Sequence, residues 1–190
     1  MTLPLIVGIS GASGAPYAVR LLQVLRELHI PAHLIISKSG VRTVKEESAV
    51  SVDEMRTLAT VNYSNSDLGA SVSSGSFKTR GMIVIPCSIR TLSDVAHGTT
   101  DNLLSRAADV VLKERRRLVL VVRETPLHHG HLRSMLAATE NGAIIMPPVP
   151  AFYHRPQSVA DIVDQTVGRC LDLFEIDSGL VKPWLSPSGE

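Results

Sequence analysis

Five short, almost continuously apolar runs mark out the sequence, and a segment with helical character follows each of them. The runs cover residues 3–10, 32–37, 81–88, 117–124 and 143–148. Strands that are buried on both faces have this composition, because neither side of such a strand meets water. Helical segments between the runs supply the crossovers that parallel strands need. The sequence therefore predicts an α/β fold: a doubly wound, mainly parallel sheet flanked by helices in a three-layer sandwich.

Helix signals fill the segments between the predicted strands. Leucines recur at helical spacing from Tyr17 to Leu28, and Ser51 with Glu54 forms a capping-box pattern. We further expect a short helix containing Glu46 and Glu47, helices over residues 100–114, 127–142 and 158–176, and a loop over residues 69–79. Because no linker or repeat divides the 190 residues, we expect one domain over residues 1–190 that ends in a helix and a tail.

Charge and composition argue against two classes of partner. The formal net charge is +1, and three Phe, three Tyr and one Trp are too few and too scattered for a base-stacking platform. We therefore expect no nucleic-acid partner. We also expect no membrane partner, because no apolar stretch reaches the roughly 20 residues of a membrane span. Cys87 and Cys170 lie far apart in apolar segments, as reduced, buried thiols do. With no signal-like N-terminus, these features predict a cytoplasmic protein.

A glycine-rich stretch at residues 6–15, IVGISGASGA, follows the first predicted strand and opens the first predicted helix. It is not a P-loop, because Ala-Pro-Tyr follows the last glycine where that motif needs a lysine and a hydroxyl residue. Its glycine spacing differs from the dinucleotide fingerprint, and the second strand lacks the acidic ribose ligand. Two interpretations stay open. Ser10 and Ser13 lie beside backbone N–H groups that bind an anion, or Ser13 merely caps a helix after a tight turn.

Polar side chains follow several predicted strands, at the edge where a doubly wound sheet binds its ligands. Hydroxyl groups stand at Ser37, in residues 73–76 (SSGS) and in residues 88–91 (SIRT). Arg123 and Glu124 end a buried strand, and a charge pair in that place favours a site over a structural ion pair. Their repetition at one edge indicates an anion-binding site.

Three further patterns indicate structure rather than chemistry. Arg106 and Lys113 lie two turns apart on one predicted helix, which by spacing alone indicates a solvated face. The HHGH stretch at residues 128–131 has no carboxylate or second thiol spaced with it, so no metal site is indicated. Cys87 has no activating group beside it in the sequence, which favours a packed strand thiol over a nucleophile.

Seven stretches, in order along essentially the whole chain, carry a resemblance to a known family. They read GISGASGAPYAVRLLQVLRE, SSGSF, IPCSIRTL, RAADVVLKERR, LVVRETPLHHGHL, GAIIMPPVPAFYHRPQS and KPW. They resemble the UbiX-type flavin prenyltransferases, which are similar to doubly wound flavin-binding proteins of the Rossmann or flavodoxin-like kind. Lys182 and Pro183 depart from the family pattern, which has an arginine before the tryptophan, and this departure affects only the tail.

The resemblance implies an enzyme, a prenyltransferase. Such enzymes join the dimethylallyl group of dimethylallyl phosphate to N5 and C6 of reduced FMN, which closes a fourth ring and releases phosphate. The resemblance also implies a homo-oligomer, a dodecamer built of trimers. The prenylated FMN passes to a UbiD-type decarboxylase, in many bacteria for ubiquinone biosynthesis.

The resemblance further implies roles for individual residues. The residues expected to bind FMN are Gly11, Ala12, Ser13, Ser37, Ser88, Ile89, Arg90, Thr91 and Arg123. Those expected to hold the donor phosphate are Tyr153 and Arg169, joined by Arg106, Lys113 and Ser74, some of them from a neighbouring subunit. Glu124 matches a catalytic acid near that phosphate, and Ser13 and Glu47 are the other residues implied in catalysis.

The chemistry of allylic C–O cleavage agrees with these residues. Most prenyl transfers stabilise the leaving phosphate with Mg²⁺ held by clustered aspartates, and this chain has no D-D-x-x-D cluster. Arg106, Lys113, Arg169 and the Tyr153 hydroxyl offer charge-assisted hydrogen bonds in its place. We therefore expect transfer without a metal, and we expect Glu124 to protonate the departing phosphate from a partly buried position.

Two alternatives accompany this interpretation. A flavin-dependent cysteine decarboxylase resembles the same fold, but its P-x-M-N-x-x-M-W signature is not matched by residues 146–153, MPPVPAFY. A non-catalytic flavin carrier or decarboxylase subunit needs the flavin contacts but neither Glu124 nor the donor-phosphate residues.

Overall fold

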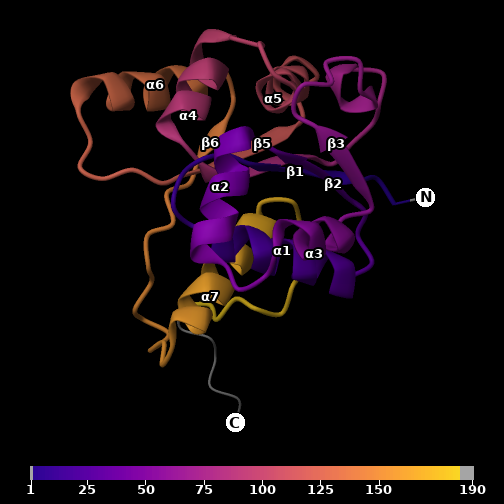
Figure 1. Ribbon diagram of the computed structural model, residues 1–190. Helices are drawn as coiled ribbons and strands as arrows, with labels where there is room; N and C mark the ends of the chain where they lie inside the picture. Colours follow the sequence, from indigo (N-terminus) through magenta and orange to yellow (C-terminus); the bar gives the residue numbers. More distant parts are fainter. Residues whose placement is uncertain (1, 185–190) are drawn as a thin grey trace.

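The computed structural model describes residues 2–184, and its strands form one parallel sheet (Figure 1). The strands are β1 (Leu5–Ile9), β2 (Ala32–Ile36), β3 (Val61–Ser64), β4 (Gly81–Cys87), β5 (Arg117–Val122) and β6 (Ile144–Ile145). Their order across the sheet is β3-β2-β1-β4-β5-β6, and each neighbouring pair is parallel. The predicted doubly wound α/β sheet is confirmed.

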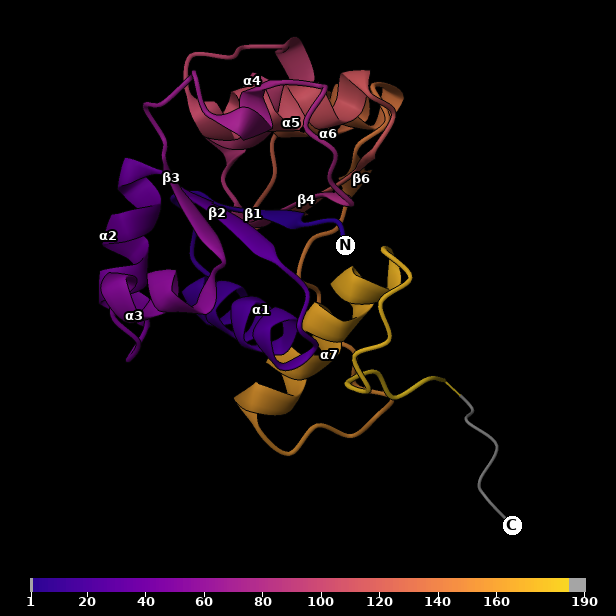
Figure 2. The ribbon, with the colours of Figure 1, turned by 90° about the vertical axis from the view of Figure 1, so that its right-hand side faces the viewer.

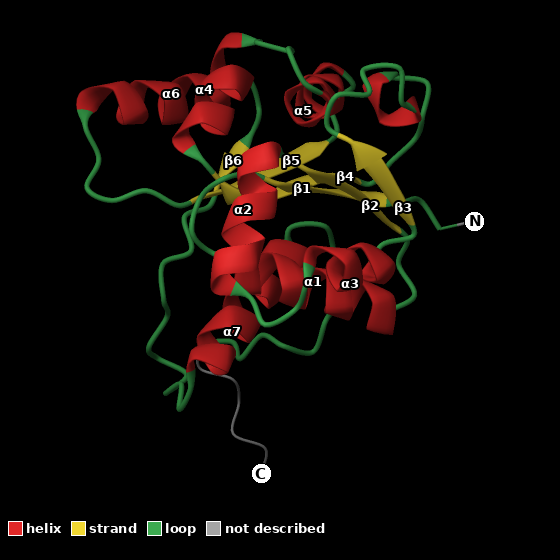
Figure 3. Cartoon of the chain, in the orientation of Figure 1, coloured by secondary structure: helices red, strands yellow, loops and turns green. Residues whose placement is uncertain are grey.

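Helices cover both faces of the sheet, as Figures 2 and 3 show. On one face lie α1 (Ala15–Glu27), α2 (Lys38–Glu47), α3 (Val52–Leu58) and α7 (Val159–Asp172). On the other face lie α4 (Ile89–His97), α5 (Leu103–Lys113) and α6 (His129–Glu140), with the short 3-10 turn η1 (Ser71–Ser73) beside α5. The arrangement is the three-layer sandwich that the sequence predicts.

The alternation of side chains along β1 explains its continuous apolar run. Leu5, Val7 and Ile9 pack into the core beneath α1 and α7, whereas Ile6 faces the core beneath α4 and α5. All four side chains are at most 1% exposed. Because successive residues of a strand point to opposite faces, a strand in the middle layer needs apolar residues at every position.

One strand and one α-helix lie outside the predicted set. The strand β3 stands at the sheet edge, and its residues VNYS alternate between half-buried and exposed positions, so no apolar run marks it. The helix α4 begins inside the SIRT stretch, directly after β4. The sheet therefore has six strands among residues 2–184, where the sequence predicts five.

Several predicted local signals are confirmed. Ser51 and Glu54 form a reciprocal capping box at the start of α3. Gly142, expected to end a helix, has a φ of 101° just after α6, a backbone conformation that glycine adopts without strain. The last helix ends at Asp172, four residues earlier than expected. No helix within residues 2–184 has the length and apolar character needed to cross a bilayer.

The winding of the chain fixes where a ligand site belongs. From β1 the chain moves outward through β2 to β3, and it then returns to place β4 on the other side of β1. The strands β1 and β4 therefore flank the point where the winding direction reverses. In doubly wound sheets a ligand crevice opens at the carboxyl ends of the strands at this point.

Candidate active site

The carboxyl ends of β1 and β4 are tied together by one buried serine. The Ser10 hydroxyl donates to the Pro86 carbonyl at 3.0 Å and accepts from the Ser88 N–H at 2.7 Å. Ser10 is 1% exposed. Its hydroxyl therefore holds the two strand ends in register, and it is not the free ligand donor that one interpretation of the glycine loop requires.

Close packing explains two glycines of the loop between β1 and α1. A Cβ on Gly11 would collide with the side chain and backbone of Ser39, at the start of α2. Gly14 has a φ of 127°, in the region that side chains rarely adopt. The loop thus turns sharply and lies directly against the N-terminus of α2.

Glu47, at the C-terminal end of α2, caps the N-terminus of α1. Its carboxylate accepts hydrogen bonds from the Gly14 N–H at 2.7 Å and from the Ala15 N–H at 3.0 Å. The N-cap residue of α1 is Gly14, which has no side chain to cap the helix. The alternative in which Ser13 caps α1 is therefore wrong, and the first N–H groups of α1 face an anionic group.

Ser13, Glu47 and Arg123 form one cluster, which we call the glycine-loop cluster. Burial alone would raise the pKa of Glu47, but hydrogen bonds from Gly14, Ala15 and Ser13 and the charge of Arg123 outweigh it, so the pKa lies below its usual value. Arg123 follows β5, where its N–H donates to the Cys87 carbonyl at 3.0 Å. The structure thus brings together three predicted site residues that come from three different segments.

Two more predicted residues begin helices at the same edge of the sheet. Ser37 follows β2 and accepts from the Gly40 N–H at 3.0 Å, which caps α2. Ser88 follows β4 and accepts from the Thr91 N–H at 3.3 Å, which caps α4. With α1, three helix N-termini follow the carboxyl ends of β1, β2 and β4. The N-terminus of α1 already faces the Glu47 carboxylate, whereas the positive ends of the α2 and α4 dipoles suit an anion such as a phosphate.

The remaining predicted residues of this edge differ in exposure: Thr91 is buried, Ile89 is half-buried, and two charged residues are exposed. Ile89 and Arg90 form the first turn of α4 with Thr91, and Arg90 is exposed. Glu124 is exposed as well, and its Oε1 accepts from the Thr125 N–H at 3.0 Å. The expected partial burial of Glu124 is therefore wrong for the single chain, because nothing in residues 2–184 covers this carboxylate.

Ser74 and Lys113 lie together at a different place. Lys113 ends α5 and pairs with Glu114, and a Cβ on Gly75 would collide with Glu114 and lie 2.7 Å from the Lys113 ammonium. Because Lys113 precedes β5, it stands at the amino ends of the strands, opposite the glycine loop. Arg106, earlier on α5, pairs with Asp109 at 2.7 Å.

Tyr153 and Arg169 form a third group, on α7 and the segment before it. The Tyr153 hydroxyl accepts from Gln165 Nε2 at 2.9 Å, and its ring meets the Trp184 ring edge-on with centroids 5.5 Å apart. Arg169 lies one turn after Gln165 and pairs with Asp172 at 2.7 Å. Within the described part of the chain, no hydrogen bond or ion pair joins this group, or Ser74 and Lys113, to the glycine-loop cluster.

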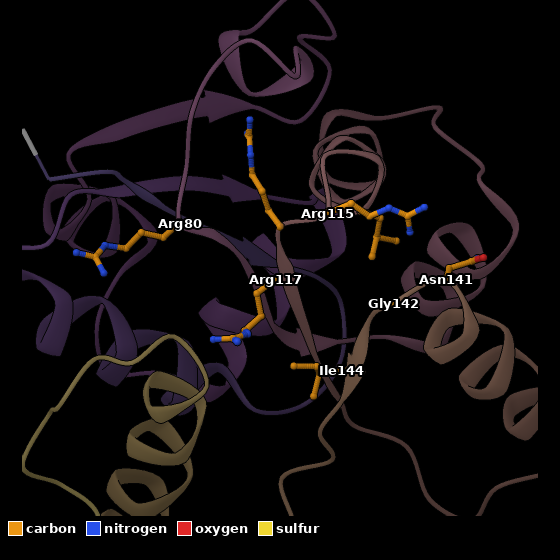
Figure 4. Close-up of a pocket in the computed structure, with 8 residues that line it drawn as sticks. Arg80, Arg115, Arg117, Asn141, Gly142 and Ile144 are labelled. Carbon is orange, nitrogen blue, oxygen red and sulfur yellow. The ribbon is translucent and has the colours of Figure 1, made fainter.

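An arginine-lined cavity of about 480 Å³ opens at the amino ends of the strands (Figure 4). In Figure 4 the side chains of Arg80 and Arg117 extend to the left and that of Arg115 to the right, so the three guanidinium groups do not converge on one anion. Arg80 donates to the Leu3 carbonyl at 3.3 Å, and Arg117 donates to the Leu173 carbonyl. This cavity lies away from the glycine loop and is not the predicted site.

Residues 2–184 contain neither a reactive cysteine nor a histidine cluster that suits a metal ion. Burial raises the pKa of the Cys87 thiol well above its usual range, and it raises that of Cys170 to about 12. Both are therefore packed, inert thiols, as predicted for Cys87. Among residues 2–184, no three His, Cys, Asp or Glu side chains gather in a way that suits a metal ion.

The sequence is similar to known flavoproteins along most of its length. Residues 2–171 match the family described as Flavoprotein. The flavin prenyltransferase UbiX of Escherichia coli (strain K12) is 62% identical over 173 residues, which are 90% of this chain and 92% of that protein.

The structure is also similar to solved structures of UbiX-type proteins. A crystal structure of AnUbiX (PadA1) in complex with FMN and dimethylallyl pyrophosphate has a TM-score of 0.96 at 48% identity, and the match covers 98% of this chain and 99% of that one. A dodecameric FMN-dependent UbiX-like decarboxylase from Escherichia coli O157:H7 has a TM-score of 0.94 at 47% identity, covering 97% and 100%.

The fold, with its cluster of helix N-termini at the switch point, and the family match define a doubly wound α/β flavoprotein. Within that class, the chain belongs to the UbiX flavin prenyltransferases. The family assignment made from the seven motifs is confirmed. Neither alternative, the cysteine decarboxylase or the non-catalytic carrier, is favoured by these relatives.

Proposed function

We propose that this protein transfers the dimethylallyl group of dimethylallyl phosphate to N5 and C6 of reduced FMN and releases phosphate. The observation that carries the proposal is the 62% identity over 173 residues to a flavin prenyltransferase. The solved relative with FMN and dimethylallyl pyrophosphate supports both the acceptor and the five-carbon donor.

The glycine-loop cluster is the proposed flavin site. The N-termini of α2 and α4 offer backbone N–H groups to the FMN phosphate. Its other contacts come from Gly11 to Ser13, Ser37, the segment Ser88–Thr91 and Arg123. Reduced FMN supplies the nucleophilic ring atoms. The Glu47 carboxylate fixes the loop that carries Ser13, so it holds this side chain in one orientation.

The donor-phosphate residues are proposed to come from neighbouring subunits. Tyr153 with Arg169 and Ser74 with Lys113 lie apart from the glycine-loop cluster in the single chain, and Arg106 is engaged on α5. A dodecamer, as in the relative from Escherichia coli O157:H7, brings such surfaces together. The same contact would cover Glu124, which is proposed to give its proton to the departing phosphate.

Transfer without a metal is part of the proposal, and three cationic side chains support it. Arg106, Lys113 and Arg169 are cationic side chains, and they stabilise the charge that develops on the leaving phosphate through charge-assisted hydrogen bonds. In prenyl transfers that use Mg²⁺, the cation has this role.

The proposal extends to the domain organisation, the cellular location and the recipient of the product. One flavin-binding domain over residues 1–190, with a C-terminal helix and tail, is supported by the single sheet. A cytoplasmic location is supported by two buried, unpaired cysteines. The prenylated FMN is proposed to pass to a UbiD-type decarboxylase, for which ubiquinone biosynthesis is one use.

The deciding experiment is anaerobic. Purified full-length protein receives reduced FMN and dimethylallyl phosphate in the presence of a chelator, and the released flavin is analysed by mass spectrometry. We expect a flavin heavier by one five-carbon unit, and parallel reactions with dimethylallyl pyrophosphate distinguish the two donors. An unmodified flavin that stays bound would contradict the proposal and favour a carrier.

A further inference from the structure

The serine segment, residues 71–77, is held at both ends by side chains with no role in the proposed reaction. Gly75, the neighbour of Ser74 in this segment, lies beside the Lys113 ammonium. The Ser74 and Ser76 hydroxyls lie 2.9 Å apart on the exposed side of the segment. Three turns hold its backbone: the N–H groups of Ser73, Ser74 and Phe77 donate to carbonyls three residues earlier.

Arg116 forms hydrogen bonds with the C-terminal end of the serine segment. Its guanidinium donates to the Phe77 carbonyl at 2.6 Å and to the Gly75 carbonyl at 2.7 Å. The side chain is 18% exposed, and Glu114 lies 3.9 Å from the guanidinium. A cation that donates to two carbonyls of one short loop fixes the loop in direction as well as in distance.

Tyr63 contacts Ser71, the N-terminal residue of the serine segment. Its hydroxyl is 2.8 Å from Ser71 Oγ and 3.0 Å from His33 Nδ1. His33 is 8% exposed, and the Phe77 ring packs beside it with centroids 5.5 Å apart. The edge strand β3 thus anchors the first residue of the segment to the neighbouring strand β2.

The middle of the serine segment lies against Lys113 and Glu114 at the end of α5. Gly75 leaves no room for a Cβ against Glu114 and the Lys113 ammonium, so the segment lies in direct contact with the end of α5. Glu114 pairs with Lys113 and lies near Arg116, which links the lysine to the arginine that holds the segment. A shift of the segment would therefore separate Ser74 from Lys113.

We propose that Arg116 and Tyr63 are positioning residues that clamp the serine segment against α5, so that Ser74 and Lys113 form one preorganised subsite for the donor phosphate. The inference rests on the proposed function for the identity of the bound anion. Preorganised donors stabilise a developing charge better than mobile ones do, because they need no reorganisation when the charge appears.

The test compares Arg116→Gln with Arg115→Gln in the full-length protein. Arg115 is the adjacent, exposed arginine, and its side chain makes no hydrogen bond or ion pair among the described residues. For Arg116→Gln we expect the donor KM to rise about tenfold while the FMN Kd changes by less than about twofold. Hydrogen exchange at the amides of Ser73, Ser74 and Phe77 should also quicken. Arg115→Gln should change none of these quantities.

Two milder variants keep the test decisive if Arg116→Gln does not fold. Tyr63→Phe removes one hydroxyl and should raise the donor KM and quicken exchange at Ser73. Arg116→Lys keeps the charge but not the paired hydrogen bonds, so its donor KM should fall between those of the wild type and Arg116→Gln.

The outcomes separate this inference from the proposed function. If the wild-type protein transfers no prenyl group, the proposed function fails. If the wild type is active and Arg116→Gln keeps the wild-type donor KM, the inference is overturned, whether or not exchange in the segment quickens. Equal losses of donor and FMN affinity would overturn it as well, because they would indicate a general structural defect.

Discussion

A single carboxylate, Glu47, fixes the turn into α1, and its removal gives a prediction at the scale of one residue. Glu47→Gln keeps a hydrogen-bond acceptor but loses the negative charge that faces the helix N-terminus and Arg123. Because the group lies near solvent, we expect the free energy of unfolding at pH 7 to fall by only about 0.5–1 kcal/mol. Urea denaturation measures this loss.

The pH dependence of that loss follows from the pKa of Glu47, which folding lowers from its usual 4.5. The unfolded state then binds more protons, so the contribution is complete above pH 4.5 and disappears as the pH falls through the lower folded value. The wild type and Glu47→Gln should therefore converge in stability in acid. Glu46→Gln is the matched control, since Glu46 pairs only with exposed Arg42. An equal loss at pH 4 and pH 7 would show that the charge is not responsible.

Individual residues also show how far a sequence can describe this site. Ser37, Ser88 and Arg123 could be predicted, because each follows an apolar run that must be a strand. The roles of Ser10 and Glu47 could not, because Ser10 bonds across to β4 and Glu47 reaches from the far end of α2. Contacts between segments so distant in the chain leave no local pattern.

At the scale of elements, the junction between the glycine loop and α2 is closely packed. Gly11→Ala would drive a Cβ into Ser39, so the loop or the start of α2 must shift. We expect a loss of about 1–3 kcal/mol in unfolding free energy, together with weaker FMN binding. Gly69→Ala is the control, because its Cβ would meet only Asp67 Oδ1 at 3.4 Å. FMN titration of both variants measures the effect, and equal FMN affinity would refute the importance of this junction.

The elements that sequence analysis finds and misses differ in burial. The strands β1, β2, β4 and β5 have nearly every residue buried, which produces apolar runs that mark them without ambiguity. The edge strand β3 has no fully buried residue and produces no such run. The helix α4 has only nine residues, and it starts in a hydroxyl-rich stretch that equally suits a loop. Edge position and short length therefore account for both omissions.

At the scale of the whole molecule, the predicted site residues divide into three groups in the single chain. The glycine-loop cluster lies at the carboxyl edge of the sheet, Ser74 and Lys113 lie at the amino edge, and Tyr153 and Arg169 lie with α7. No sequence pattern predicts this separation, because it depends on how α5 and α7 cross the sheet. A site that needs all three groups therefore requires neighbouring subunits to supply the missing ones.

Mixed oligomers test that requirement directly. Glu124→Gln and Lys113→Ala should each be nearly inactive alone, because one lacks the proton donor and the other a phosphate ligand. If different subunits supply the two residues, unfolding and reassembling an equal mixture should leave about one site in four with both intact and restore that share of turnover. A mixture of Glu124→Gln with Arg123→Ala is the control, since the two residues are adjacent in the chain directly after β5 and every subunit carries one defect. No recovery in the first mixture would show that one chain supplies both Glu124 and Lys113, which contradicts the requirement. Recovery in the control would show that the regained turnover does not report sites shared between subunits.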